Sequence, residues 1–445
     1  MRYLPELLTK SLPAALSVIA ATAAAAGELQ IDADAAVQMA LAASQRLVAA
    51  DARIGAAQFT VDAADAARLP VVGTSAGVSQ RSAVPEFAAP TGGPGTEPVV
   101  IFPNIETTYA AAIGARQPLY AGGGIQAGRE AARHGLAAAD SGQDLTLLDL
   151  RYQARVSYWG TVASDAALGA AQAQELRALR LLEDARSLRQ AGMAVDADVL
   201  GGEARAASAR LDVVRASTER SNRLAGLRSL LGVAADIDLA LADRGTHQLP
   251  PMPAPLNELL AAASDSRPEL AIVDARIAEA LATERSVNAA RKPAVGLAAQ
   301  WDIARPNVRC LPLEDAWNDS WSVGLLASWT VFDGERALSD AAAVRAEAQA
   351  MAADRDELAR QVRLQVETAR LSLEAALEAV ESADAARKAA AAREEASRER
   401  YAAGLAPIVE MLDAQAELAD AEVAQITVRA AAWIATAELE RAIGR

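Results

Sequence analysis

An internal repeat constrains this chain more than any other feature of its sequence. The pair Ala191-Gly192 recurs as Ala403-Gly404, which is an offset of 403 − 191 = 212 residues. The stretch 51–54 (Asp-Ala-Arg-Ile) recurs identically as 274–277, at an offset of 274 − 51 = 223 residues. Further pairs that keep these offsets are Leu231-Gly232 with Ile443-Gly444, and Pro70 with Pro293. Matches in a constant order indicate that the chain is a tandem duplication.

The repeat divides the chain into a first half, residues 27–250, and a second half, residues 251–445. Each half reads as a helix, a β-hairpin, a long helix and a further helix, with the hairpins at about 71–118 and about 294–332. The first half is longer by 223 − 212 = 11 residues between Pro70 and Leu119, where prolines and glycines predict a long loop.

Both halves contain a very long helical segment. In the second half, neither proline nor glycine occurs from Glu335 to Ala403. Apolar residues recur there every three or four positions, as on one face of an amphipathic helix; they are Leu358, Val362, Val366, Ala369, Leu373, Leu377 and Val380. A helix over this stretch would be roughly 100 Å long. The equivalent helix of the first half is predicted from Gly124 to Gln190. Such lengths indicate a coiled-coil or tubular assembly, although a soluble periplasmic coiled coil would show the same pattern.

Four segments alternate in the manner of β-strands. Trp321–Val331 places Trp321, Val323 and Leu325 on one face and mostly small or polar residues on the other. The segments 295–303 and 109–116 alternate likewise, and Val71–Gln80 alternates weakly.

Aromatic residues towards the strand ends suggest what these strands contact. Strands of about ten residues with one apolar face and terminal Trp or Tyr are typical of membrane strands with an aromatic girdle. The predicted girdle residues are Tyr109, Trp301, Trp321 and Trp329. The alternative is an antiparallel sheet packed on a core, which has the same period. A closed membrane barrel needs at least about eight strands, so four strands per chain would require several chains to share one barrel, and three copies would give twelve.

The amino terminus has the three parts of a secretory signal peptide. Arg2 and Lys10 precede the uncharged, largely apolar run 12–26, which ends in Ala24-Ala25-Ala26. We therefore expect residues 1–26 to be removed and the protein to be exported. No later run of about 18 purely apolar residues occurs, so any part that enters a membrane must do so as β-structure. The net charge of −15 disfavours binding to nucleic acid.

Segment 401–415 (YAAGLAPIVEMLDAQ) resembles the most recognisable motif of the TolC-like outer-membrane efflux proteins. Supporting similarities are 117–122 (QPLYAG), 267–270 (RPEL), 329–334 (WTVFDG) and 437–444 (AELERAIG). The resemblance implies a homotrimer in the lipid of the outer membrane. Its chains would share a twelve-stranded barrel and continue into the periplasm as a long α-helical barrel. It implies an exit duct for efflux or type I secretion, working with a periplasmic adaptor protein and an inner-membrane transporter.

The resemblance also assigns roles to particular residues. The turns Gly192-Met193 and Gly404-Leu405 correspond to the tunnel tip, where the family docks its adaptor; the simpler interpretation is a glycine that ends a helix. Glu410 and Asp413 align with acidic residues at the tunnel constriction, where three copies would form a negative ring that favours cations. Their alternative is a solvated helix face. Family members often carry a basic residue two positions after the motif glycine, but this chain has Ala406, so that latch is not expected.

Two other classes of function compete with the exit duct. A soluble periplasmic scaffold or adaptor would lack alternating strands with terminal tryptophans. An exported enzyme would need a catalytic constellation, but His134 and His247 have no second ligand at metal spacing, and Gly122-Gly123-Gly124 lacks the remainder of a phosphate-binding loop. The single cysteine, Cys310, cannot form an intramolecular disulfide. We therefore expect no enzymatic activity, cofactor or metal, and no motif specifies the transported substrate.

Overall fold

The computed structural model describes residues 28–89, 98–243, 249–311 and 313–445. The expected signal peptide and His247 lie outside these residues. The chain divides into two compact units, which do not coincide with the two sequence repeats. Unit 1 comprises Met1–Asp51, Ser141–Leu270 and Glu357–Arg445, and unit 2 comprises Ala52–Asp140 and Ala271–Asp356. Each unit therefore takes residues from both halves of the duplication.

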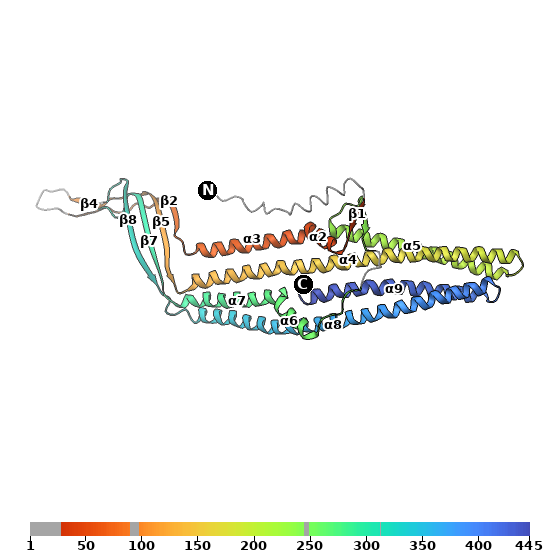
Figure 1. Ribbon diagram of the computed structural model, residues 1–445. Coiled ribbons are helices and arrows are strands. Elements are labelled where there is room, and N and C mark those ends of the chain that lie inside the picture. The colour runs from red at the N-terminus through yellow and green to blue at the C-terminus, as the bar shows by residue number, and fades with distance from the viewer. Residues whose placement is uncertain (1–27, 90–97, 244–248, 312) are drawn as a thin grey trace. The chain divides into compact units, whose positions relative to one another are not determined.

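Helices make up most of the chain, as Figure 1 shows. They are α2 (Ala33–Ala43), α3 (Gln45–Ala66), α4 (Gly124–Gln190), α5 (Asp196–Leu231), α6 (Leu256–Ser266), α7 (Pro268–Asn288), α8 (Arg336–Ala402) and α9 (Ile408–Ala442), with a short 3-10 helix at Ala289–Arg291. The two longest, α4 and α8, have 67 residues each. Their bounds match the prediction made from proline and glycine positions. No helix in the described part of the chain combines the length and apolar character needed to cross a bilayer.

Equivalent contacts in the two halves confirm the duplication. Gly232 ends α5 in the left-handed conformation, and a Cβ placed on it would lie 2.6 Å from the Cβ of Ala43 at the end of α2. Gly444 follows α9 in the same conformation, and its Cβ would lie 2.6 Å from the carbonyl oxygen of Ser266 at the end of α6. These residues keep the sequence offsets, since 444 − 232 = 212 and 266 − 43 = 223. The duplication therefore extends to the close packing of helix ends.

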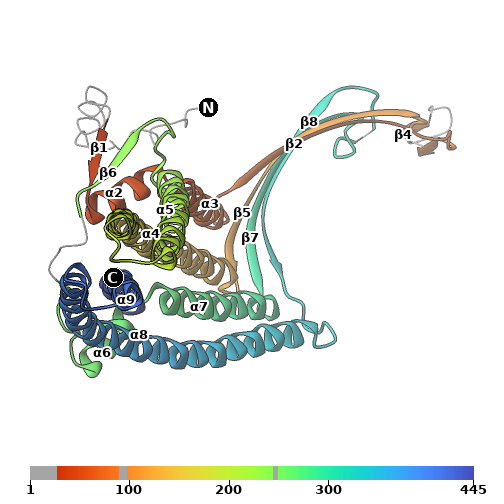
Figure 2. The same ribbon diagram turned by 90° about the vertical axis from the view of Figure 1, so that its right-hand side faces the viewer.

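A four-stranded antiparallel sheet lies in unit 2. Its strands are β2 (Val71–Gln80), β5 (Thr107–Ala121), β7 (Ala294–Arg305) and β8 (Asn318–Ser328), in that spatial order. Figure 2 shows that the sheet is strongly curved along its strands. The predicted continuation of the last strand to Val331 is wrong: β8 ends at Ser328, and Trp329 and Val331 lie in the segment that leads to α8. Gly122 and Gly123, both at positive φ, separate β5 from α4.

Two small sheets were not predicted. In unit 1, β1 (Glu28–Ile31) pairs in parallel with β6 (Asp238–Leu241). In unit 2, β3 (Phe87–Ala89) and β4 (Val99–Phe102) form an antiparallel pair within the expected long loop.

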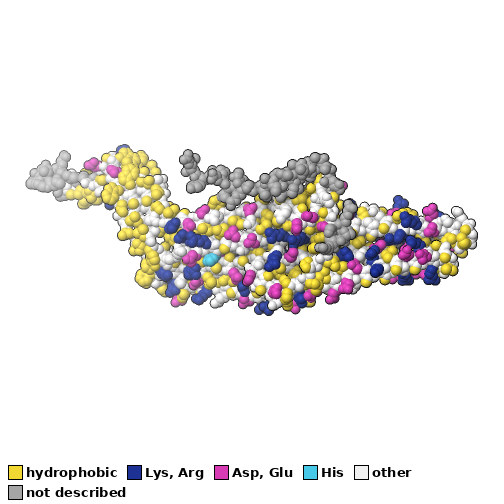
Figure 3. Space-filling model, viewed as in Figure 1, with side chains coloured by type: hydrophobic (Ala, Val, Ile, Leu, Met, Phe, Trp, Pro, Cys, Tyr) yellow, Lys and Arg dark blue, Asp and Glu magenta, His cyan; other side chains and the backbone are white. Residues whose placement is uncertain are grey.

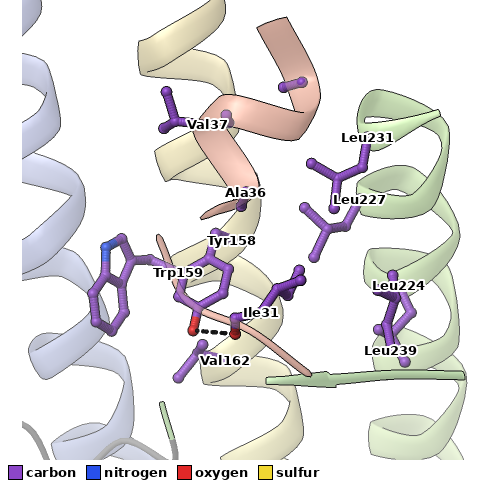
Figure 4. Packing of buried hydrophobic residues seen from close by; sticks show 12 residues of the cluster. Ile31, Ala36, Val37, Tyr158, Trp159, Val162, Leu224, Leu227, Leu231 and Leu239 are labelled. Atoms are coloured by element: carbon purple, nitrogen blue, oxygen red, sulfur yellow. Dashed lines mark hydrogen bonds between the residues drawn. The ribbon is translucent and has the colours of Figure 1, made fainter. Parts of the chain in front are cut away.

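The core of unit 1 surrounds Tyr158, whose side chain is fully buried on α4 (Figure 4). Its hydroxyl lies 2.6 Å from Oδ2 of Asp243 and 3.3 Å from the carbonyl oxygen of Ile31. The neighbouring Trp159 stacks on Trp433 of α9 with ring centroids 4.8 Å apart. Leucines of α5 complete this cluster; they are Leu224, Leu227 and Leu231. The small parallel sheet is thereby attached to helices from both repeats.

Candidate functional site: the two faces of the sheet and the helical turns

The strand register gives the four-stranded sheet two chemically different faces. Trp301 lies directly opposite Trp321, and Leu297 lies opposite Leu325. On the inner pair, Ile113 lies opposite Trp301. Directly opposed residues of antiparallel strands point to the same side. These side chains and their neighbours at every second position form what we call the aromatic face; it includes Tyr109, Ile113, Leu297, Trp301, Trp321, Val323 and Leu325.

The aromatic face is not covered within its unit. Trp321 is 70% exposed and Leu325 is 72% exposed, which is far from the burial of a sheet packed on a core. Figure 3 shows hydrophobic side chains gathered over the strands. Apolar surface of this extent indicates a contact with lipid or another protein. The face therefore agrees with the membrane interpretation better than with a packed sheet.

Three of the four predicted girdle residues, Tyr109, Trp301 and Trp321, lie on this face, and Trp329 lies just beyond the end of β8. The indole nitrogen of Trp301 donates to Oδ2 of Asp319 at 3.2 Å, and Tyr109 packs on Trp317 with ring centroids 5.9 Å apart. Trp329, just beyond β8, donates to the carbonyl oxygen of Arg291 at 3.0 Å. Eight residues separate Trp321 from Trp329, or about 27 Å along a strand. This spacing is close to the apolar band of about 25 Å in outer-membrane barrels.

The opposite side of the sheet carries mainly small residues, and we call it the small-residue face. Its members include Gly73, Ser75, Ala112, Gly114, Ala298, Ser320, Ser322 and Gly324. Two charged residues, Arg116 and Asp302, lie on it. Alternate positions on one strand thus separate apolar from small or polar side chains, as in a strand between lipid and water.

The two helical turns of unit 1 have the same geometry. Gly192 follows α4 at a φ of 78°, and Gly404 follows α8 at a φ of 72°. The N–H of Met193 donates to the carbonyl of Leu188 at 2.8 Å. The N–H of Leu405 donates equivalently to the carbonyl of Arg400, also at 2.8 Å. Both are Schellman turns, in which glycine adopts a conformation that other residues avoid.

Each turn presents one large apolar side chain. Met193 is 71% exposed and Leu405 is 73% exposed. Val195 and Val409 beside them are also exposed. The glycines therefore do end the helices, as the simpler interpretation has it, and each turn in addition has an exposed apolar surface.

The two predicted constriction residues have different surroundings. Glu410, in the first turn of α9, forms an ion pair of 2.6 Å with Arg400 at the end of α8. Asp413 is exposed, and no ion-pair partner for it occurs within the described ranges. The local sequence pattern does not single out Arg400 as a partner of Glu410. Arg400 precedes Gly404 by four residues and Glu410 follows it by six. This spacing could have indicated the pair, because two helices that meet at a tight turn bring residues at similar distances from the turn close together.

A buried cluster joins the two helical hairpins near the turns. Leu181 and Ala185 of α4 pack against Tyr401, Ile408 and Met411. Beside the cluster is a cavity of about 280 Å³. The Tyr401 hydroxyl is buried and has no hydrogen-bond partner among the described residues. Burial raises the pKa of this phenol, and the nearby carboxylates of Asp198 and Asp184 raise it further.

The sequence and structure of this chain are similar to those of known channel proteins. The family model described as outer membrane efflux protein matches residues 36–233 and 259–445. No curated protein matches the chain. The outer-membrane channel OprN is similar in structure, with a TM-score of 0.75, 21% identity and coverage of 93% of this chain and 89% of OprN. VceC from Vibrio cholerae has a TM-score of 0.75 and 19% identity, and the match covers 93% of this chain and 96% of VceC. The Neisseria gonorrhoeae MtrE channel has a TM-score of 0.71 and 18% identity, and the match covers 92% of this chain and 88% of MtrE.

Proposed function

The chain belongs to the outer membrane efflux protein family, and from that premise we propose that three copies assemble into an exit duct that passes substrates from the periplasm to the exterior. The duct serves a tripartite efflux system or a type I secretion system. The similarity at the level of fold supports this function over a soluble periplasmic scaffold.

The two-faced sheet is the observation that carries the proposal. Each chain supplies four strands, and the outer strands of that sheet, β2 and β8, have no neighbouring strand on their free edges within the described residues. Open strand edges are not tolerated in lipid, because unpaired N–H and C=O groups there cost several kcal/mol each. Pairing β8 of one copy with β2 of the next closes a ring of twelve strands. The aromatic face then contacts lipid and the small-residue face surrounds water.

The helical turns are proposed to dock a periplasmic adaptor. Met193 and Leu405 provide an apolar side chain at each turn, and the glycines allow a tight turn with no larger side chain in the way. An inner-membrane transporter would supply the energy through that adaptor. Glu410 and Asp413, the latter with its exposed carboxylate, are proposed to line the constriction near these turns.

Single-channel recording tests the proposed function directly. The protein is extracted from outer membranes in detergent, its oligomer is sized, and it is inserted into a planar bilayer. A trimer with cation-selective openings is the expected result. A water-soluble monomer without conductance would contradict the shared barrel.

Docking requires a separate test, in which binding to adaptors from the same cell is measured by crosslinking. Met193→Asp with Leu405→Asp should abolish the crosslink and leave the trimer intact. Val423→Asp serves as the matched control, because Val423 is also an exposed apolar residue of α9 but lies far along the helix from the turn. Undiminished crosslinking by the double variant would remove the turns from the docking surface.

A further inference from the structure

The small-residue face of the sheet carries two charges of opposite sign at different levels. Asp302 of β7 lies opposite Ala112 of β5, and Arg116 of β5 lies opposite Ala298 of β7. The outer strands have only uncharged residues at these two levels. Ser320 of β8 lies opposite Asp302, Val71 of β2 lies opposite Arg116, and Gly324 of β8 lies opposite Ala298 at the level of Arg116. Four residues on β5 separate Ala112 from Arg116, which is about 13 Å along the strand.

Neither charge is neutralised by its surroundings. Asp302 accepts a hydrogen bond from the side-chain amide of Gln300, its neighbour on the same face. Arg116 is exposed, and neither residue forms an ion pair within the part of the chain that the structure describes. Most side chains around them are Ala, Gly or Ser, so the carboxylate and the guanidinium extend beyond the surrounding surface.

The aromatic face differs between the two levels: it has no charged residue around the level of Arg116, whereas beside Asp302 it carries Asp319 of β8, opposite Ile303. From Trp301 to Val295, the aromatic face of β7 has only Trp, Ala, Leu and Val. A charged residue facing lipid in a barrel costs about 2–4 kcal/mol at the midplane. The charge of Arg116 therefore identifies the small-residue face as the one in contact with water, and Asp302 shares that face with it.

We propose that Asp302 and Arg116 line the interior of the shared barrel as two rings of opposite charge and adjust the ion preference that the constriction gives the duct. The inference rests on the proposed trimeric duct. Three copies give a ring of three carboxylates and, nearer the helices, a ring of three guanidinium groups. A solute leaving the helical part meets the positive ring first. The carboxylate ring favours small cations and the guanidinium ring favours small anions.

Removing the charge of one ring should shift the ion preference in the opposite direction to removing the charge of the other. Asp302→Asn leaves the guanidinium ring alone and should shift the reversal potential under a KCl gradient towards anion preference. Arg116→Gln should shift it towards cation preference. Both shifts should be large near 0.01 M salt, where the Debye length is about 30 Å, and should vanish near 1 M, where it is about 3 Å. Asp302→Glu should retain the value of the parent protein.

Chemical labelling tests the position of Asp302 independently of conductance. In a Cys310→Ser background, Asp302→Cys should react with a charged, membrane-impermeant methanethiosulfonate added from outside. Leu297→Cys, on the aromatic face of the same strand, is the matched control and should react at least on the order of tenfold more slowly, because lipid excludes the charged reagent.

The outcomes separate this inference from the proposed function. If the parent protein forms no channel, the proposed duct fails and the rings fail with it. If the parent conducts, but Asp302→Cys reacts no faster than Leu297→Cys or the two charge variants shift the reversal potential in the same direction, the rings are wrong and the duct stands.

Discussion

Glu410 and Arg400 form an ion pair across the turn at Gly404, and the repeat explains why. The first-half equivalent of Glu410 is Asp198, since 410 − 198 = 212, and it accepts a hydrogen bond of 3.2 Å from the backbone N–H of Val195. The residue equivalent to Val195 is Pro407, which has no N–H to donate. The second turn therefore lacks the capping donor, and it has Arg400 where the first half has Leu188, so the Glu410 carboxylate pairs with that guanidinium.

Removing Arg400 should therefore make the proposed constriction more negative. Arg400→Gln leaves three Glu410 carboxylates without their cations, and the cation-to-anion permeability ratio should rise by about twofold or more. The measurement is the reversal potential of single channels in a KCl gradient. Arg398→Gln is the control, because it removes the same charge from a residue whose carboxylate neighbour, Glu395, lies on its own helix. Equal effects of the two variants would show that the pair has no special role.

A charge on the aromatic face should disrupt insertion, and the same charge one residue further should not. Leu325 lies midway between Trp321 and Trp329, so Leu325→Arg should destabilise the assembled barrel by about 2–4 kcal/mol. Leu326 is similarly exposed but points to the small-residue face. Heat-induced dissociation of trimers extracted from membranes measures both variants. If Leu325→Arg is as stable as Leu326→Arg, the assignment of the faces is wrong.

The glycine that ends α5 should be less replaceable than the glycine of the turn after α8. Gly232 and Gly404 both have positive φ, so alanine costs about 1–2 kcal/mol at either position through backbone strain. Only at Gly232 would the new methyl group also meet another atom, the Cβ of Ala43 at 2.6 Å. Denaturant unfolding should show a greater loss of stability for Gly232→Ala than for Gly404→Ala. A reversed order would contradict the close packing of α2 and α5.

Alkaline pH should weaken the cluster around Tyr401. Burial holds the pKa of its phenol above the ordinary value of about 10. The stabilisation that depends on the neutral phenol is thus complete below pH 10 and is lost as the pH rises through the folded-state pKa. Tyr401→Phe should remove this contribution to the pH dependence, and it should cost little at neutral pH because the hydroxyl has no partner among the described residues. Urea-induced dissociation at neutral and alkaline pH compares the parent with the variant; an identical alkaline loss in both would exclude Tyr401 as its source.

The bounds of the long helices and the two faces of the sheet could be predicted from the sequence alone. Proline and glycine stop helices by simple backbone rules, so the bounds of α4 and α8 could be read from Gly124 and Glu335. Alternation placed Trp301 and Trp321 on one face, and the observed register puts them opposite each other. The alternation continued to Val331, although the strand ends at Ser328, because side-chain pattern does not report where backbone pairing stops.

Other features depend on contacts that a local pattern cannot encode. Strands β1 and β6 have four residues each and lie more than two hundred residues apart, so neither shows a period of its own. Glu410 was recognised through a motif, but its pairing with Arg400 depends on the geometry of the intervening turn. Alternation within 295–303 and 109–116 puts Asp302 and Arg116 on the non-aromatic side, and only the register shows that they occupy separate levels.

The division of each compact unit between both repeats has a consequence for biogenesis. Strand β5 comes from the first repeat and its neighbour β7 from the second, so an exported chain presents β5 with one free edge until about 170 further residues have crossed the inner membrane. Unit 1 likewise includes α9, the last helix of the chain, and cannot be completed before α9 is present. Neither half of the duplication is therefore a completed folding unit, and each compact unit can close only after both repeats have been made.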